Sequence, residues 1–150
     1  MQMASVVFTV SRTFASTPAD VWSALIDWDN HGEWIPATRM DLGDNDAHSV
    51  GDVFTAYTGY GPLTLVDRMR ISELKWNEID EVGECEVEKL GPVLSGTAGF
   101  IVRKAPVGAA LDWTENVEVR FLPGPLGPPV SWIFAKGFVL AMRRLANTLS

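Results

Sequence analysis

Apolar and polar residues alternate with a period of two along several stretches of the chain, a pattern typical of half-buried β-strands. The clearest stretch is 109–121, AALDWTENVEVRF, in which Val117 and Val119 alternate with Glu118 and Arg120. Turns containing glycine or proline separate it from other stretches of the same kind. These stretches predict further strands over residues 5–14, 38–43, 51–58, 63–73, 76–81, 84–90 and 95–104.

Two short helices are predicted between the first two strands. Thr17 precedes Pro18, which is the usual order of an N-cap and a first helical residue. Asp20 falls in the first turn, where the helix dipole favours a carboxylate. A second short helix is expected over 28–34, ended by the Ile35–Pro36 dipeptide.

Helical spacing returns at the C-terminus, after a stiff corner formed by PGPLGPP, residues 123–129. The apolar positions that repeat there predict one helix of about five turns; they are Val130, Phe134, Phe138, Ala141, Leu145 and Leu149. A long amphipathic helix and about seven antiparallel strands can bury each other only if the sheet bends around the helix. We therefore predict an α+β fold with apolar space beneath the C-terminal helix, where small molecules bind.

One charged residue interrupts the apolar face of residues 109–121. Counting back from Phe121 in steps of two places Glu115 on the same face as Val117 and Trp113. Because a bare buried carboxylate is costly, we expect Glu115 to border a partly wet cavity or to meet a cation. Arg12 lies on the apolar face of its own strand and could be that cation, although the sequence leaves open whether the two meet.

Other inward positions complete the set of candidate ligand contacts. Asp67 also lies between apolar residues, in LTLVDRMRI, and is interpreted as a strand-edge or bulge residue. The remaining candidates are apolar and fall on predicted inward faces, where ordinary core packing is the competing interpretation; they are Phe54, Met69, Phe100, Trp113, Phe138 and Met142.

Composition and charge narrow the range of partners. The 150 residues are 47% hydrophobic and 21% charged, which fits one globular domain over residues 1–150. The net charge of −7 argues against nucleic acid and anionic membrane surfaces, since both require a basic face. There is no signal-peptide pattern, and no run of 18 apolar residues. We expect a soluble, cytoplasmic protein without integral membrane association, either a monomer or a homodimer.

The residue types needed for metal or nucleophilic chemistry are sparse. His31, His48 and the single Cys85 do not have the spacing of a zinc site. Cys85 lies on an apolar strand face that Val87 continues, so a buried structural thiol is expected. TGYGPL lacks the lysine and following helix of a phosphate loop. We predict neither a metal nor another cofactor.

Several motifs together resemble one known family. STPADVWSALIDWDNHGEWIP, VGDVFTAYTGYGPLTLVDRMRISE and GPVLSGTAGFIVRKAPVGAALDWTENV, followed by the terminal helix, are similar to the polyketide cyclase/dehydrase group of the START/Bet v 1-like (SRPBCC) superfamily. The resemblance implies the helix-grip fold and a hydrophobic cavity. It also implies that the two short helices form one lip of that cavity, with Trp34 as a candidate gate residue.

Three functions stay open at this point, because a fold does not determine a reaction. The first is binding, transport or sequestration of a small hydrophobic molecule such as a lipid or polyketide. The second is a cyclase, aromatase or dehydratase, which requires at least two convergent ionisable groups with shifted pKa values. The third is a partner-binding regulatory domain without a functional cavity, for which the apolar corner PLGPPVSW with Trp132 is the candidate surface.

Overall fold

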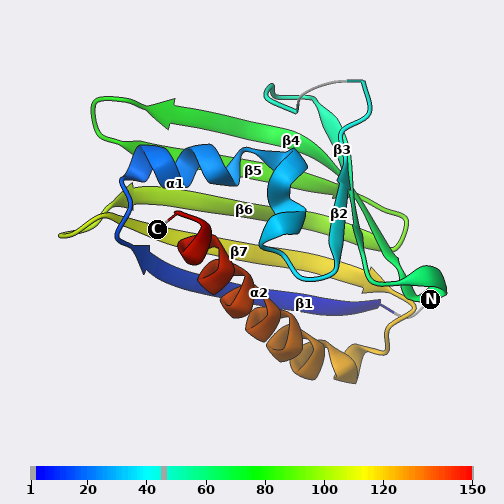
Figure 1. The fold of residues 1–150 in the computed structure, drawn as a ribbon. Helices are drawn as coiled ribbons and strands as arrows, with labels where there is room; N and C mark the ends of the chain where they lie inside the picture. The colour runs from blue at the N-terminus through cyan, green and yellow to red at the C-terminus, as the bar shows by residue number, and fades with distance from the viewer. Residues whose placement is uncertain (1–2, 45–46, 150) are drawn as a thin grey trace.

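The computed structural model describes residues 3–44 and 47–149, and within them one seven-stranded antiparallel sheet bends around a long C-terminal helix (Figure 1). The predicted domain boundaries at residues 1 and 150 lie outside the described residues. In chain order the elements are β1 (Met3–Phe14), α1 (Pro18–Leu25), η1 (Trp28–Glu33), β2 (Thr38–Asp41), β3 (Val53–Thr58), η2 (Gly61–Leu63), β4 (Leu65–Asn77), β5 (Val82–Leu90), β6 (Leu94–Lys104), β7 (Ala109–Arg120), η3 (Gly124–Leu126) and α2 (Gly127–Leu149).

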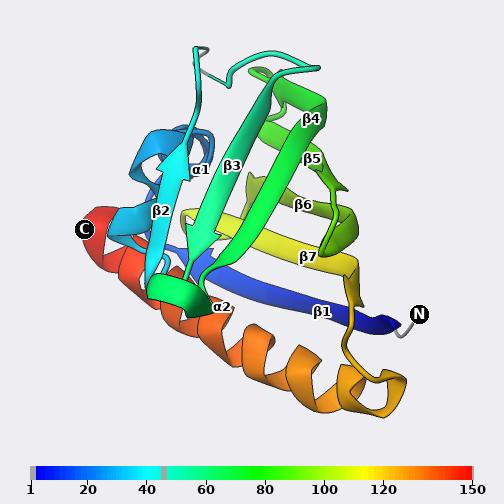
Figure 2. The same cartoon turned by 90° about the vertical axis from the view of Figure 1, so that its right-hand side faces the viewer.

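The strands are ordered β1-β7-β6-β5-β4-β3-β2, and every neighbouring pair is antiparallel. Figure 2 shows the resulting curve, with β3 and β4 turned away from the direction of β1 and β7. The helices α1, η1 and α2 lie on the concave side (Figures 1 and 2). This arrangement confirms the predicted α+β fold and places the inward side chains of most strands around one interior.

The first helix begins as the sequence predicts. The Thr17 hydroxyl accepts a hydrogen bond from the backbone N–H of Asp20 at 3.2 Å, and Pro18 is the first helical residue. Such a cap satisfies one of the backbone donors that a helix start leaves unpaired. The apolar face of α1, which includes Val21, Trp22 and Leu25, is buried against the sheet.

One prediction about the strands was wrong. The stretches 63–73 and 76–81 are not two strands: β4 runs through to Asn77, and residues 78–81 form the turn to β5. The pairing with β5 shifts by one residue between Ile71 and Glu73. A bulge adds one residue to a strand, so the inward positions change from odd to even numbers beyond it. The change of phase resembled the end of one strand and the start of another.

The C-terminal helix also begins earlier than predicted, at Gly127, and its first turn includes two prolines. Proline is tolerated there because the first backbone N–H groups of a helix have no intrahelical partner. The second half of α2 is anchored by buried Ala141, Met142 and Leu145. The first half is more open: the side chains of Trp132 and Ile133 are 64% and 59% exposed.

Two glycines offer a matched test of the backbone. Gly108 joins β6 to β7 with φ +76°, and a Cβ atom there would collide with the carbonyl oxygen of Phe14. We expect Gly108→Ala to lower the free energy of unfolding by about 2 kcal/mol, in the range of backbone strain. Gly137 lies inside α2 with open space around it, so Gly137→Ala should raise stability by about 0.5–1 kcal/mol. Urea unfolding of both variants checks the two signs, and equal signs would contradict this interpretation.

Candidate functional site

An apolar hollow lies between the concave face of the sheet and η1. Its empty volume is about 570 Å³, counted out to its open mouth. Inward residues of β3 to β7 form one wall, while Trp28 of η1, Ile35 and Phe138 of α2 cover it. Its apolar lining consists of Trp28, Ile35, Met40, Phe54, Ala56, Met69, Cys85, Val87, Ala98, Phe100, Trp113 and Phe138. We call this space the inner hollow.

A second space, the outer hollow, lies between α2 and the sheet and has an empty volume of about 810 Å³, also counted out to its mouth. Phe134, Gly137 and Ala141 of α2 line one side. The opposite side includes Val6, Phe8, Leu65, Leu94 and Val117. The two hollows adjoin, because six residues line both: Ile35, Thr58, Asp67, Lys89, Glu115 and Phe138.

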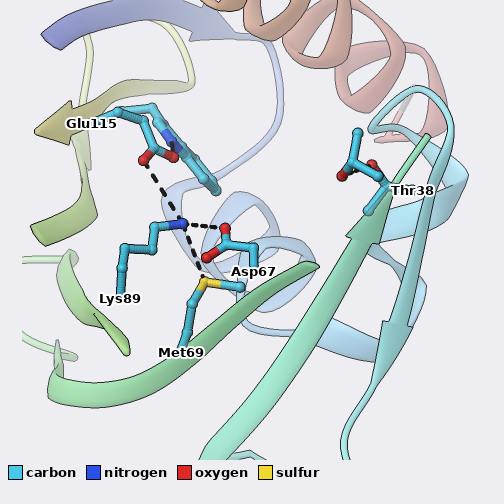
Figure 3. A network of polar contacts seen from close by, with 7 residues as sticks. Thr38, Asp67, Met69, Lys89 and Glu115 are labelled. Atoms are coloured by element: carbon cyan, nitrogen blue, oxygen red, sulfur yellow. Dashed lines mark hydrogen bonds and ion pairs between the residues drawn. The ribbon is translucent and has the colours of Figure 1, made fainter. Parts of the chain in front are cut away.

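Three charged side chains meet where the hollows adjoin (Figure 3). Lys89 Nζ donates to Asp67 Oδ2 at 2.5 Å and to the sulfur of Met69 at 3.4 Å. Glu115 Oε2 lies 3.8 Å from the same nitrogen, and Glu115 Oε1 accepts the indole N–H of Trp113 at 3.2 Å. We refer to Asp67, Lys89 and Glu115 as the charged cluster.

Strand pairing explains why these groups meet. Asp67, Lys89 and Glu115 come from β4, β5 and β7, and each occupies an inward position of its strand. Lys89 pairs directly with Met69 across β4 and β5, so Asp67 is its diagonal neighbour, within reach of a long side chain. Lys89 and Glu115 are each only 7% exposed.

Burial and the neighbouring charges shift the pKa values of Glu115 and Lys89. Burial raises the pKa of the Glu115 carboxyl, and the Lys89 ammonium and the Trp113 N–H offset only part of that effect. Burial also acts to lower the pKa of Lys89, but attraction to Glu115 and Asp67 outweighs it, so the net direction of the Lys89 pKa is upward. Lys89 is therefore a charged donor, and Glu115 is a carboxyl that takes up a proton more readily than usual.

A second polar spot faces the inner hollow from β2 and β3. The Thr38 and Thr58 hydroxyls lie 3.0 Å apart, and the Thr38 hydroxyl donates to the carbonyl oxygen of Pro36 at 2.9 Å. Figure 3 shows Thr38 on a different strand from the charged cluster, across the space. These neutral groups suit a ligand oxygen rather than a ligand charge.

The structure brings together most of the residues that the sequence singled out. Glu115 faces the interior as predicted, while its neighbours Thr114 and Asn116 are exposed. Five of the apolar candidates line the inner hollow with it: Phe54, Met69, Phe100, Trp113 and Phe138. Their role in ligand contact stays a prediction.

Three candidates lie elsewhere. Trp34 is buried edge-on against Trp113, with ring centroids 6.2 Å apart, and does not line either hollow. Met142 is buried on the packed side of α2 and also lies outside both linings. Arg12 packs over the ring of Phe14, with Cζ 5.9 Å from its centroid.

The cation beside Glu115 is Lys89 rather than Arg12. In the β1–β7 register Glu115 is opposite Phe8, whereas Arg12 is opposite Leu111, four residues along the strand. At about 3.4 Å per residue this separation is too long for a direct pair. The sequence did contain a signal for Lys89, because it continues the alternation of Cys85 and Val87. Asp67 likewise belongs to an ion pair rather than to a strand edge or bulge.

Two further titratable groups line the inner hollow, and both are neutral near pH 7. Burial lowers the pKa of His31 to about 4, although its Nε2–H donates to the carbonyl oxygen of Leu25 at 2.6 Å. Burial raises the pKa of the Cys85 thiol to about 12, as expected of a structural thiol. Across residues 3–44 and 47–149, no three His, Cys, Asp or Glu side chains cluster in a way that could hold a metal ion. In the same residues no helix is long and apolar enough to cross a membrane.

Comparisons with known proteins agree with this architecture. Residues 5–149 match the family described as polyketide cyclase/dehydrase and lipid transport. No curated protein matches the chain significantly.

Solved structures similar to the chain share its fold along nearly the whole length. Ara h 8.0201 has a TM-score of 0.64 and 15% identity, with 97% of this chain and 98% of that chain covered. The Zhui aromatase/cyclase from Streptomyces sp. R1128 has a TM-score of 0.66 and 14% identity, with 99% and 94% covered. Major latex-like protein 151 from Panax ginseng has a TM-score of 0.62 and 16% identity, with 98% and 99% covered. Identities this low support the helix-grip fold and nothing finer.

Proposed function

The chain belongs to the polyketide cyclase/dehydrase and lipid transport family, and from that premise we propose that it binds a small hydrophobic molecule in its interior. The observation that carries the proposal is the pair of adjoining hollows, whose linings are apolar except for a few polar groups, most of which lie where the hollows meet. Pockets of this kind gain affinity from apolar burial and orient the ligand through a few polar contacts.

The aromatic lining supports the same function. Trp113 contacts Phe100 and Phe138, with ring centroids 5.3 Å and 5.0 Å apart, and Phe138 contacts Phe8 at 5.5 Å. This row of rings leads from the inner hollow to the outer hollow, because Phe100 lines only the first and Phe8 only the second. A planar or extended apolar ligand would contact ring faces along its whole length.

A second candidate function is catalysis of the cyclase, aromatase or dehydratase kind. The charged cluster favours it, because it brings together several ionisable groups, and two of them, Lys89 and Glu115, have shifted pKa values, as such an enzyme requires. In that case Glu115 would donate a proton, and Lys89 would stabilise negative charge on a ligand oxygen. Glu115→Gln would then abolish turnover of a polyketide-like substrate while leaving its binding measurable.

The binding function predicts saturable uptake of a neutral apolar dye such as N-phenyl-1-naphthylamine. The dissociation constant should be micromolar, which corresponds to a binding free energy of about −8 kcal/mol. Phe138→Ala should weaken binding about tenfold, because Phe138 lines both hollows. Fluorescence titration measures the effect. Phe100→Ala and Phe134→Ala, which each alter one hollow, show which of the two holds the dye.

Ile133→Ala is the matched control for this titration. Ile133 is 59% exposed on α2, beside Phe134, and lines neither hollow. Its removal should leave dye affinity unchanged. No saturable binding by the wild type, or an equal loss in Ile133→Ala and Phe138→Ala, would contradict the proposal.

A further inference from the structure

The charges around the two hollows do not balance. Their charged lining residues are one ammonium, Lys89, and two carboxylates, Asp67 and Glu115. His31 and Cys85 add no charge near pH 7, since their pKa values are about 4 and about 12. The interior thus carries one negative charge in excess when both carboxyls are ionised. A buried charge without a partner is unfavourable, so this site favours either a proton on Glu115, in line with the raised pKa of that carboxyl, or an occupant that supplies a positive charge.

The contact distances assign the excess to Glu115. Lys89 donates to Asp67 at 2.5 Å and to the Met69 sulfur at 3.4 Å, while its distance to Glu115 Oε2 is 3.8 Å, too long for a hydrogen bond. Glu115 Oε1 already accepts from the Trp113 indole. Oε2 is therefore the acceptor that a ligand donor would complete, and Glu115 lines both hollows.

Two aromatic residues, Phe8 and Phe138, line the outer hollow together with Glu115. Phe8 is the direct cross-strand partner of Glu115, so their side chains are neighbours on the inward face of the sheet. Phe138 packs against Phe8 and Trp113 and lines both hollows. Ring faces attract cations, most strongly where water is excluded. The surroundings of Oε2 thus combine an acceptor, an unmatched negative charge and π faces.

Resting on the proposed binding function, we infer that the ligand is a hydrophobic amine, whose ammonium donates to Glu115 Oε2 beside Phe8 and Phe138 and whose apolar body fills the hollows. A neutral alcohol could make the hydrogen bond but supplies no positive charge, so Glu115 would stay uncompensated or would have to take up a proton. A carboxylate would add a second excess charge, and Lys89 is already engaged by Asp67. The geometry therefore ranks amine above alcohol above carboxylate.

Three probes of equal chain length test this ranking: decylamine, decanol and decanoate. Each is titrated at pH 7 by calorimetry, the amine and the carboxylate below their micelle concentrations and the alcohol below its solubility limit. We expect the wild type to bind decylamine at least tenfold more tightly than decanol, and decanoate more weakly than decanol. Glu115→Gln should reduce decylamine affinity at least tenfold and leave decanol affinity within about threefold, a change under 1 kcal/mol. The wild-type ranking needs no variant, so the test survives if Glu115→Gln folds poorly.

Glu118→Gln is the matched control, because Glu118 lies on the outer face of the same strand, where it accepts a hydrogen bond from Ser5. It changes the net charge equally, so it separates a local effect of Glu115 from general attraction of an amine to a chain of net charge −7. Tight binding of decanoate, or an amine preference that persists in Glu115→Gln, would overturn the inference and leave the binding function intact. Failure of decanol and decylamine alike to bind would contradict both.

Discussion

Lys89→Met should lower the free energy of unfolding by about 3–5 kcal/mol, the usual result of removing one partner from a buried ion pair. Methionine fills most of the lysine volume, so the expected loss comes from charge rather than from a cavity. Without the ammonium, Asp67 and Glu115 face each other as two carboxyls in an apolar interior. Because a whole domain is stabilised by about 5–15 kcal/mol, this single change would remove a large share. Denaturant unfolding at pH 7 measures it.

Two further variants separate the charge effect from packing. Lys104→Met also removes a short ion pair, with Glu81 Oε2 at 2.8 Å, but the Lys104 side chain is 59% exposed, so stability should change little. Combining Lys89→Met with Asp67→Asn and Glu115→Gln leaves no bare charge and should return most of the lost stability. If Lys89→Met is as stable as Lys104→Met, the charged cluster is better hydrated than its burial indicates.

The triple variant also bears on why the cluster exists. Apolar or neutral residues in place of a buried ionic group often match or exceed the original stability. A triple variant that is as stable as the wild type but no longer prefers amines would show that the charges serve binding rather than folding. A variant that stays unstable would instead show that these residues help to determine how β4, β5 and β7 pack.

The alternation of apolar and polar residues along the strands marks both Glu115 and Lys89 as charged residues on inward faces. Glu115 was placed correctly because a single carboxylate interrupts a long apolar face on β7. Lys89 interrupts the inward face of β5 in the same way, two residues beyond Val87, and applying the rule to that strand would have found it. Periodicity shows which face of a strand a residue occupies, but it does not show which residue of the neighbouring strand lies opposite. For this reason the sequence placed Arg12 on an inward face but could not exclude it as a partner for Glu115.

Other features depend on packing that no local pattern records. The bulge in β4 shifts the alternation by one residue, and its position is fixed by pairing with β5. The burial of His31 is another case, since its polar side chain in a short helix gives no local sign of burial. Its ring centroid lies 4.9 Å from that of Trp28 and 4.7 Å from that of Trp34, so its burial depends on the packing of three rings from η1 and its C-cap.

His31 should make the protein acid-sensitive. The ring is buried and its pKa in the folded state is about 4, against 6.5 for an unperturbed histidine. Above pH 6.5 the ring is neutral in both states, so its contribution to stability is complete. As the pH falls below 6.5, His31 becomes protonated in the unfolded chain but stays neutral in the folded protein. The free energy of unfolding therefore decreases progressively until about pH 4. The shift corresponds to a loss of about 3 kcal/mol.

Unfolding free energies of the wild type and of His31→Gln between pH 7 and pH 4 isolate this effect. Glutamine can still donate to the Leu25 carbonyl oxygen but does not titrate, so the variant should lose about 3 kcal/mol less than the wild type over that range. Taking the difference removes the opposing contribution of Glu115, whose raised pKa favours the folded state in acid. Parallel curves for wild type and His31→Gln would contradict the lowered pKa of His31 and show that the folded protein takes up a proton at this ring as readily as the unfolded chain.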